Sequence, residues 1–130
     1  MYYILKNKKA HKCKDPIKWA RCFENTKNRI VKQDLLSNGY WVSTVFLGLD
    51  HNFASKGKPL IFETMIFDKL FKSDYSNLEL DMDRYSTWNQ AINGHNKLLN
   101  KYKYKNLFRV LLFWILNKLK ICLKIIQKNK

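Results

Sequence analysis

Two long apolar runs, joined by a short polar loop, constrain the fold of this 130-residue chain most strongly. They cover residues 40–49 and 60–67, and the loop between them contains Gly57 and Pro59. Both runs are apolar on both alternating sets of positions, which is typical of central strands covered on both faces of a sheet. We therefore predict that the two runs are neighbouring strands at the centre of the domain.

The segments around these runs carry signals for helices and for shorter strands. Asp15 is a good N-cap and Pro16 suits the first helical position, while Thr87 and Gln90 match a capping box. We predict further strands at 2–5, 29–36 and 83–86, a basic loop at 6–14, and helices after Asp15, after Thr87 and from residue 106.

The predicted fold class is α+β, with an antiparallel sheet of about four strands, flanking helices and a C-terminal amphipathic helix. A chain of this length can build one hydrophobic core but not two. We therefore expect a single α+β domain over residues 1–105, followed by a basic amphipathic helix over residues 106–130.

The net charge is +15, and the positive charge is concentrated at the two ends of the chain. Residues 1–36 contain ten Lys and Arg against three Asp and Glu, and residues 101–130 contain nine against none. Residues 37–100 contain six against seven, so the two apolar runs belong to a nearly neutral segment. Basic ends can bind nucleic acid, an anionic membrane or an acidic partner. An AT-rich genome also favours lysine codons at tolerant surface positions, which would explain the excess of positive charge without any binding partner.

The apolar stretch of the C-terminal segment is too short to span a membrane. Its apolar stretch, Leu107–Leu116, has ten residues, whereas a span needs about 20. Extending it adds lysines, which each cost about 2.5–3.5 kcal/mol at the bilayer centre. As a helix, the segment has a broad apolar face and a narrow polar one. We expect the apolar face to cover the sheet, to form a homo-oligomer with another copy, or to contact a membrane surface peripherally through residues 106–130. Binding of another partner, including nucleic acid, is a further alternative.

Neither secretion nor disulfide bonding is indicated. The N-terminus turns basic at once instead of starting a signal peptide, so we expect a cytoplasmic protein. The three cysteines, Cys13, Cys22 and Cys122, are widely spaced and include no Cys-x-x-Cys pair. This pattern favours reduced thiols over a disulfide framework or a zinc site.

Five polar residues are candidates for a binding or catalytic pocket. Glu63 interrupts the second apolar run, and a buried carboxylate needs a charged or hydrogen-bonding partner. Asp50 and His51 end the first run, Arg84 precedes the helix after Thr87, and His95 falls on the inward-facing stripe of that helix. If the sheet brings them together, the candidate pocket consists of Asp50, His51, Glu63, Arg84 and His95.

Three chemical interpretations of this set remain open, beside a purely structural one. Two His and two carboxylates can ligate a divalent metal, a His with a carboxylate can act as a general base, and an Arg with two His can bind a phosphate or carboxylate. The sequence contains no H-E-x-x-H, Walker, G-x-S-x-G or G-x-G-x-x-G motif that would select one. No metal is therefore assigned, and any cofactor stays unknown.

Four further residues are predicted to support such a pocket. Trp19 and Trp88 lie on the inward-facing sides of their helices, which favours a core role over base stacking. Arg21 and Glu24 lie off the apolar stripe of the first helix, at a spacing that lets them pair.

Several motifs occur in a fixed order along the chain: a Trp19–Arg29 segment, then STVFLGLDHNF (43–53), PLIFETMIF (59–67) and RYSTW (84–88) followed by Gly94-His95. Together they resemble a family of short proteins encoded by bacteriophages and prophages. The likeness covers about residues 15–99, so the C-terminal tail lies outside it. The resemblance implies a phage context, and it implies no particular reaction.

Three hypotheses for function follow. The first is a non-enzymatic module that binds a host protein or a small anionic ligand such as a nucleotide, which would let a phage interfere with host defence. The second is a small hydrolase or nuclease that uses Asp50, His51, Glu63 and His95, with or without a metal. The third is a binder of nucleic acid or membrane surfaces through the basic ends, with affinity that falls steeply with salt.

Overall fold

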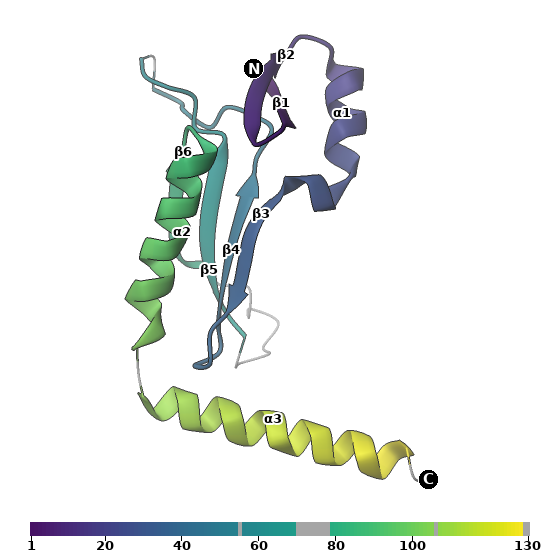
Figure 1. Cartoon of the computed structure of the whole chain (residues 1–130), viewed down its shortest axis with the longest axis vertical. Coiled ribbons are helices and arrows are strands. Elements are labelled where there is room, and N and C mark those ends of the chain that lie inside the picture. The colour runs from purple at the N-terminus through teal and green to yellow at the C-terminus, as the bar shows by residue number, and fades with distance from the viewer. Residues whose placement is uncertain (55, 70–78, 106, 129–130) are drawn as a thin grey trace.

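A four-stranded antiparallel sheet, with one long helix against one face, forms the body of the protein (Figure 1). The computed structural model describes residues 1–54, 56–69, 79–105 and 107–128. The sheet has the order β3-β4-β5-β6, and a separate β1–β2 hairpin stands with α1 at one end of it. The elements are β1 (Tyr2–Lys6), β2 (Lys9–Cys13), α1 (Pro16–Glu24), the 3-10 turn η1 (Thr26–Arg29), β3 (Ile30–Leu35), β4 (Tyr40–Phe46), β5 (Phe62–Asp68), β6 (Glu79–Tyr85), α2 (Trp88–Lys103) and α3 (Leu107–Lys128).

The predicted α+β class is confirmed, and the two apolar runs are the central strands β4 and β5. They pair antiparallel from Tyr40 opposite Asp68 to Phe46 opposite Phe62. Strand β4 is shorter than the apolar run because Gly48 adopts a φ of +70°, which is outside the extended region. The chain therefore leaves the sheet at the point where the motif reaches its glycine.

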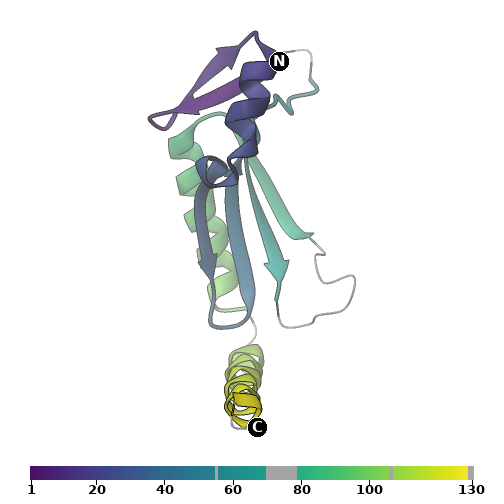
Figure 2. The same ribbon diagram turned by 90° about the vertical axis from the view of Figure 1, so that its right-hand side faces the viewer.

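Helix α2 covers one face of this sheet. Over the opposite face, α1 lies at one end only. Val42, Thr44 and Ile66 are completely buried on the face under α2. On the opposite face, which Figure 2 shows in front of α2, Leu35 is 59% exposed and Ile30 40% exposed. Helix α1 packs mainly on β1, β2 and η1. Within the described residues, the expectation that both faces are covered is therefore correct for one face only.

The basic loop predicted at residues 6–14 is wrong, because most of it forms a strand. Residues Lys9–Cys13 pair with β1 in a hairpin, and Asn7 and Lys8 take φ values of 48° and 63° at its turn. Two consecutive positive φ angles are what a tight two-residue hairpin turn requires. The strand is difficult to detect in the sequence because its side chains are mostly exposed Lys and His, with only Cys13 buried.

The remaining predicted elements are present with shifted boundaries. Asp15 caps α1, its Oδ1 accepting from the backbone N–H groups of Ile17 and Lys18. Strand β6 begins at Glu79, earlier than predicted, and residues 70–78 lie outside the described residues. Thr87 caps α2 as expected.

Helix α3 projects from the end of the body opposite the β1–β2 hairpin (Figure 1). Its predicted helical structure is confirmed over Leu107–Lys128. Among the described residues, no helix is long and apolar enough to cross a membrane. The helix carries several large apolar side chains that are more than 40% exposed, including Phe108, Trp114 and Leu119.

Candidate functional site

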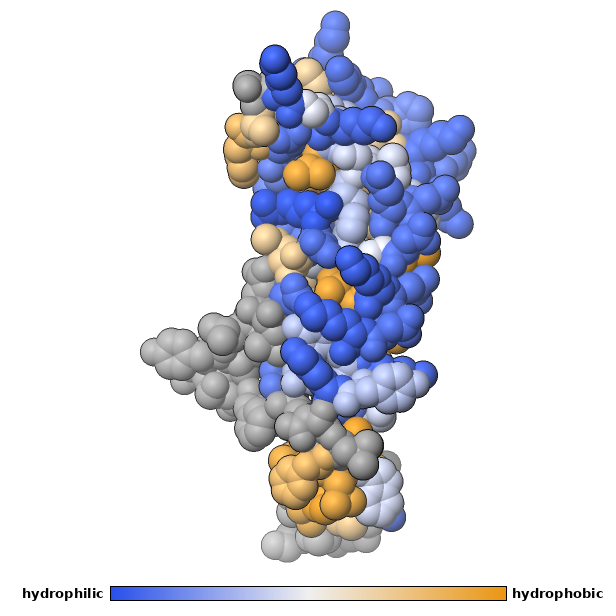
Figure 3. Space-filling model, turned by 90° about the vertical axis from the view of Figure 1, so that its left-hand side faces the viewer, coloured by the Kyte–Doolittle hydropathy of each residue, from blue (hydrophilic) through white to orange (hydrophobic). Residues whose placement is uncertain are grey.

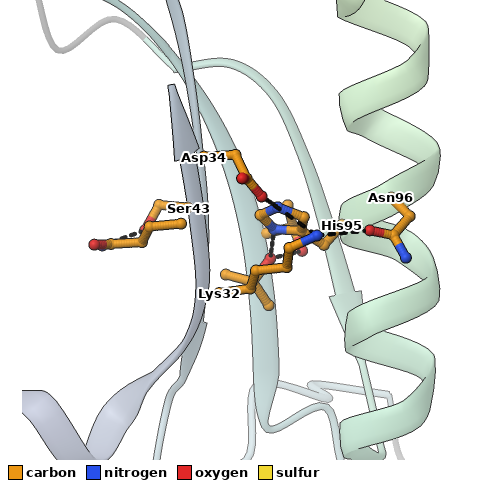
Figure 4. A network of polar contacts seen from close by, with 8 residues as sticks. Lys32, Asp34, Ser43, His95 and Asn96 are labelled. Atoms are coloured by element: carbon orange, nitrogen blue, oxygen red, sulfur yellow. Dashed lines mark hydrogen bonds and ion pairs between the residues drawn. The ribbon is translucent and has the colours of Figure 1, made fainter. Parts of the chain in front are cut away.

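The five residues of the predicted pocket lie in three separate places. Glu63 and Arg84 lie on the sheet face that α2 does not cover, because they alternate with the α2-facing residues Phe62 and Tyr85. Asp50 and His51 belong to the loop after β4. His95 points from α2 into the opposite face of the sheet (Figure 4). The sheet therefore separates residues that the pocket would need to bring together.

Glu63 and Arg84 form a cross-strand ion pair. They are direct partners in the β5–β6 register, and Arg84 Nε donates to Glu63 Oε2 at 2.6 Å. The Glu63 side chain is 10% exposed and that of Arg84 28%. This pair satisfies the requirement of a buried carboxylate for a partner. We interpret Glu63 as a residue that holds two strands together.

Asp50 and His51 have local roles in the loop after β4. Asp50 Oδ1 accepts from the backbone N–H groups of Asn52 and Leu60, at 2.8 and 3.0 Å. It thereby connects the start of the loop to its end. The His51 ring Nδ1 lies 3.0 Å from the carbonyl oxygen of Leu49. Both side chains thus stabilise the connection between the central strands.

His95 is the centre of a buried hydrogen-bond network between the sheet and α2 (Figure 4). Its Nε2 lies 2.8 Å from Asp34 Oδ2 and its Nδ1 lies 2.7 Å from Thr44 Oγ1. The Thr44 hydroxyl in turn lies 2.7 Å from that of Thr64. An ionised Asp34 can only accept, so Nε2 carries the proton and Nδ1 accepts from Thr44. At the outer end, Lys32 Nζ lies 3.3 Å from Asp34 Oδ2.

An Asp–His–Thr series has the order of groups found in nucleophilic triads, but here it is closed to a substrate. Thr44 and His95 are both 0% exposed. The Thr44 oxygen is already shared between His95 and Thr64. No group of three or more His, Cys, Asp or Glu side chains among the described residues is placed to hold a metal ion. The network fits a role in joining α2 to the sheet.

The network makes stability depend on pH. Burial lowers the pKa of His95 below its ordinary 6.5, although the Asp34 carboxylate opposes this effect. The unfolded chain then binds the His95 proton more readily than the folded one. Stability is therefore full above pH 6.5 and should fall as the pH drops below it, by up to about 1.4 kcal/mol per pH unit. Urea unfolding between pH 7.5 and 5.5 measures this slope, and His95→Gln should flatten it. An unchanged slope in that variant would contradict this role for His95.

A second constellation lies between β1, α1 and η1, and the sequence indicated only part of it. The rings of Tyr2 and Trp19 lie 4.8 Å apart, and those of Trp19 and Phe23 lie 4.9 Å apart. The guanidinium of Arg29 stacks on the Phe23 ring, 3.6 Å from its centroid. Three aromatic rings and one arginine thus form a continuous stack along α1.

Gly48 holds this stack against the sheet. Its carbonyl oxygen accepts from the Trp19 indole N–H at 3.0 Å and from the Tyr3 backbone N–H at 2.8 Å. A Cβ on Gly48 would overlap the Phe23 ring. The glycine of the apolar motif is therefore the contact point between the central strands and the Trp19–Arg29 segment.

A small cavity lies beside the stack. Its volume is about 80 Å³. Arg29 carries the only charge among the described residues that line it. The Arg29 Nε atom is buried and has no hydrogen-bond partner among the described residues. Burial lowers the pKa of Arg29 below its ordinary value, which reflects the cost of removing this charge from water. The lining residues are Tyr3, Ile4, Leu5, Trp19, Cys22, Phe23, Asn28, Arg29 and Phe46.

The supporting residues named from the sequence divide between this site and the core. Trp19 lines the cavity, whereas Arg21 and Glu24 are exposed on α1. Trp88 contacts the core, its ring lying edge-on to that of Phe62 at 6.3 Å. Comparisons with protein-family models, with curated protein sequences and with solved structures found no match to this chain.

Proposed function

We propose that this protein is a non-enzymatic binding module for a small anionic ligand, held in the cavity between β1, α1 and η1. The observation that carries the proposal is the buried Arg29 Nε, which lacks an acceptor among the described residues. Arg29 lines a cavity whose other described lining residues are uncharged. A buried donor on a charged group is costly when it is left without a partner. A ligand carboxylate or phosphate would supply that partner.

The geometry of the stack supports an anion over a neutral ligand. Stacking on Phe23 holds the guanidinium plane in one orientation, so its donors are arranged before the ligand arrives. Guanidinium groups bind carboxylates and phosphates through two parallel hydrogen bonds. Asn28 lines the same cavity and its side-chain amide can add a further donor.

The size of the cavity limits what it can enclose. One water molecule needs about 10–15 Å³ of cavity volume. A cavity of about 80 Å³ therefore accommodates a phosphate or carboxylate group but not an entire nucleotide. The remainder of a larger ligand would extend into solvent. In the phage context implied by the sequence motifs, such a module would sequester an anionic metabolite or nucleotide of the host.

Isothermal titration of the full chain with inorganic phosphate and with adenosine monophosphate tests the proposal. Arg29→Gln should weaken binding about 10- to 100-fold, because charge-assisted hydrogen bonds contribute about 1.5–3 kcal/mol. Arg21→Gln is the matched control, since Arg21 is an exposed arginine of α1 outside the cavity. It should leave the affinity unchanged.

Two results would overturn the proposal. One is the absence of saturable binding of both probes to the folded wild-type chain. The other is an equal loss of affinity in Arg29→Gln and Arg21→Gln, which would indicate that the basic surface attracts anions without a site. Circular dichroism of both variants establishes that they fold.

A further inference from the structure

We infer that α3 is an interfacial helix that docks on an anionic lipid surface. The starting observation is an apolar face without a partner among the described residues. Figure 3 shows a hydrophobic patch on α3 at one end of the molecule, and smaller ones on the body. An exposed apolar patch of this kind usually marks an interaction site. The exposed large apolar residues of α3 are Phe108 (72%), Leu111 (55%), Trp114 (55%), Ile115 (42%), Leu119 (55%) and Ile121 (59%).

The charge around this face selects its partner. Residues 101–130 contain nine Lys and Arg and no Asp or Glu. A second copy of α3 would bring the same positive charge to the contact, which opposes self-association. A nucleic acid is anionic, but its phosphate backbone provides no apolar environment in which six large side chains could be buried. An anionic bilayer surface provides both, because it combines a negative headgroup layer with an acyl region below it.

Trp114 and Lys118 have the arrangement expected at such a boundary. The Lys118 ammonium lies 3.9 Å from the centroid of the Trp114 ring. Lys118 follows Leu111 by seven residues and therefore shares its side of the helix. A lysine can bury its aliphatic stem in an apolar layer while its ammonium reaches the headgroups, and Trp is enriched at the same level. The one lysine on this apolar side is thus compatible with shallow insertion.

Docking through α3 would not cover the cavity beside Arg29. Helix α3 lies at the end of the body opposite the β1–β2 hairpin and α1 (Figure 1). The Arg29 cavity is lined by β1, α1, η1 and Phe46 of β4. A molecule docked through α3 would therefore keep this cavity in water. The lipid contact does not depend on the proposed ligand site.

Vesicle co-sedimentation of the full chain tests the inference, with phosphatidylcholine vesicles compared with vesicles containing 30% phosphatidylglycerol. We expect binding to the anionic vesicles to be at least tenfold tighter and to weaken as salt is raised. The double variant Ile115→Asp/Leu119→Asp should reduce it at least tenfold. Ile17→Asp is the control, because Ile17 is also an exposed apolar residue (65%) but lies on α1.

Three results would overturn the inference. The first is equal or absent binding to the two kinds of vesicle. The second is a dimer in light scattering that dissociates in the Ile115→Asp/Leu119→Asp variant, which would assign the apolar face to a second copy. The third is salt-sensitive binding to a DNA duplex that exceeds vesicle binding and survives the double substitution.

Discussion

Gly48→Ala should destabilise the protein by about 2–5 kcal/mol, because the residue combines two independent requirements for glycine. Its φ of +70° costs a residue with a Cβ about 1–2 kcal/mol. The Cβ would also overlap the Phe23 ring and approach the Trp19 indole nitrogen to 2.9 Å. Overpacking of this kind typically costs about 1–3 kcal/mol. Chemical denaturation followed by circular dichroism measures the total.

A double-mutant cycle with Phe23→Ala separates the two contributions. Phe23→Ala removes the ring that the new Cβ would overlap, so in that background Gly48→Ala should cost the backbone strain and the remaining close contact with the Trp19 indole, but not the overlap with Phe23. The double variant should then be more stable than the sum of the single effects by at least about 1 kcal/mol. If the two changes in the free energy of unfolding are strictly additive, the contact between residue 48 and the Phe23 ring does not contribute to the destabilisation by Gly48→Ala.

His95→Ala should have a comparable or larger effect, about 3–5 kcal/mol. The side chain is completely buried, so its removal leaves a cavity between α2 and the sheet. The substitution also leaves Thr44 without its imidazole partner and Asp34 without its main hydrogen bond. Thr44 keeps its contact with Thr64 and Asp34 stays partly exposed beside Lys32, so each of the two lost hydrogen bonds adds about 0.5–1.5 kcal/mol. A loss of this size is a large part of the usual stability of a domain.

Asn96→Ala is the matched control for this prediction. Asn96 follows His95 on α2 but is exposed, and its Oδ1 accepts from Lys32 at 2.9 Å. Loss of such a surface contact should change the free energy of unfolding by less than about 0.5 kcal/mol. Equal effects of the two substitutions in urea denaturation would show that the network around His95 is not a main link between helix and sheet.

Much of the fold could be predicted from the sequence because its strongest signals are local or periodic. The two apolar runs, the Asp15 cap and the Thr87 cap each depend on a few neighbouring residues, and all are confirmed. The inward orientation of His95 followed from helical spacing, and it is confirmed as well. The hairpin strand β2 was missed because its exposed lysines hide the alternation that marks a strand.

The sites were harder to predict because they depend on which sheet face a residue occupies. Register decides this, and a shift by one residue reverses it. The sequence could therefore predict that Glu63 needs a partner without identifying Arg84 as that partner. Asp34 gave no signal of its own, because a single carboxylate in an amphipathic strand is ordinary. The partner of His95 could be sought only once the helix was known to face the sheet.

Arg29 was missed for a related reason. In the sequence it is one of 25 Lys and Arg residues, and the general positive charge conceals it. Its distinction is structural, since it stacks on Phe23 with its Nε buried. The phage resemblance, the absence of catalysis and the identity of the ligand stay predictions.

Direct observation of the Arg29 side chain during titration tests the central claim. In a ¹⁵N-labelled full-length chain, the Nε–H signal of Arg29 can be identified by its loss in Arg29→Gln. We predict that inorganic phosphate shifts this signal along a saturable curve, while the Nε–H signal of Arg21 stays in place. An Arg29 signal that does not move, or that moves in proportion to that of Arg21 without saturating, would contradict an anion site in this cavity.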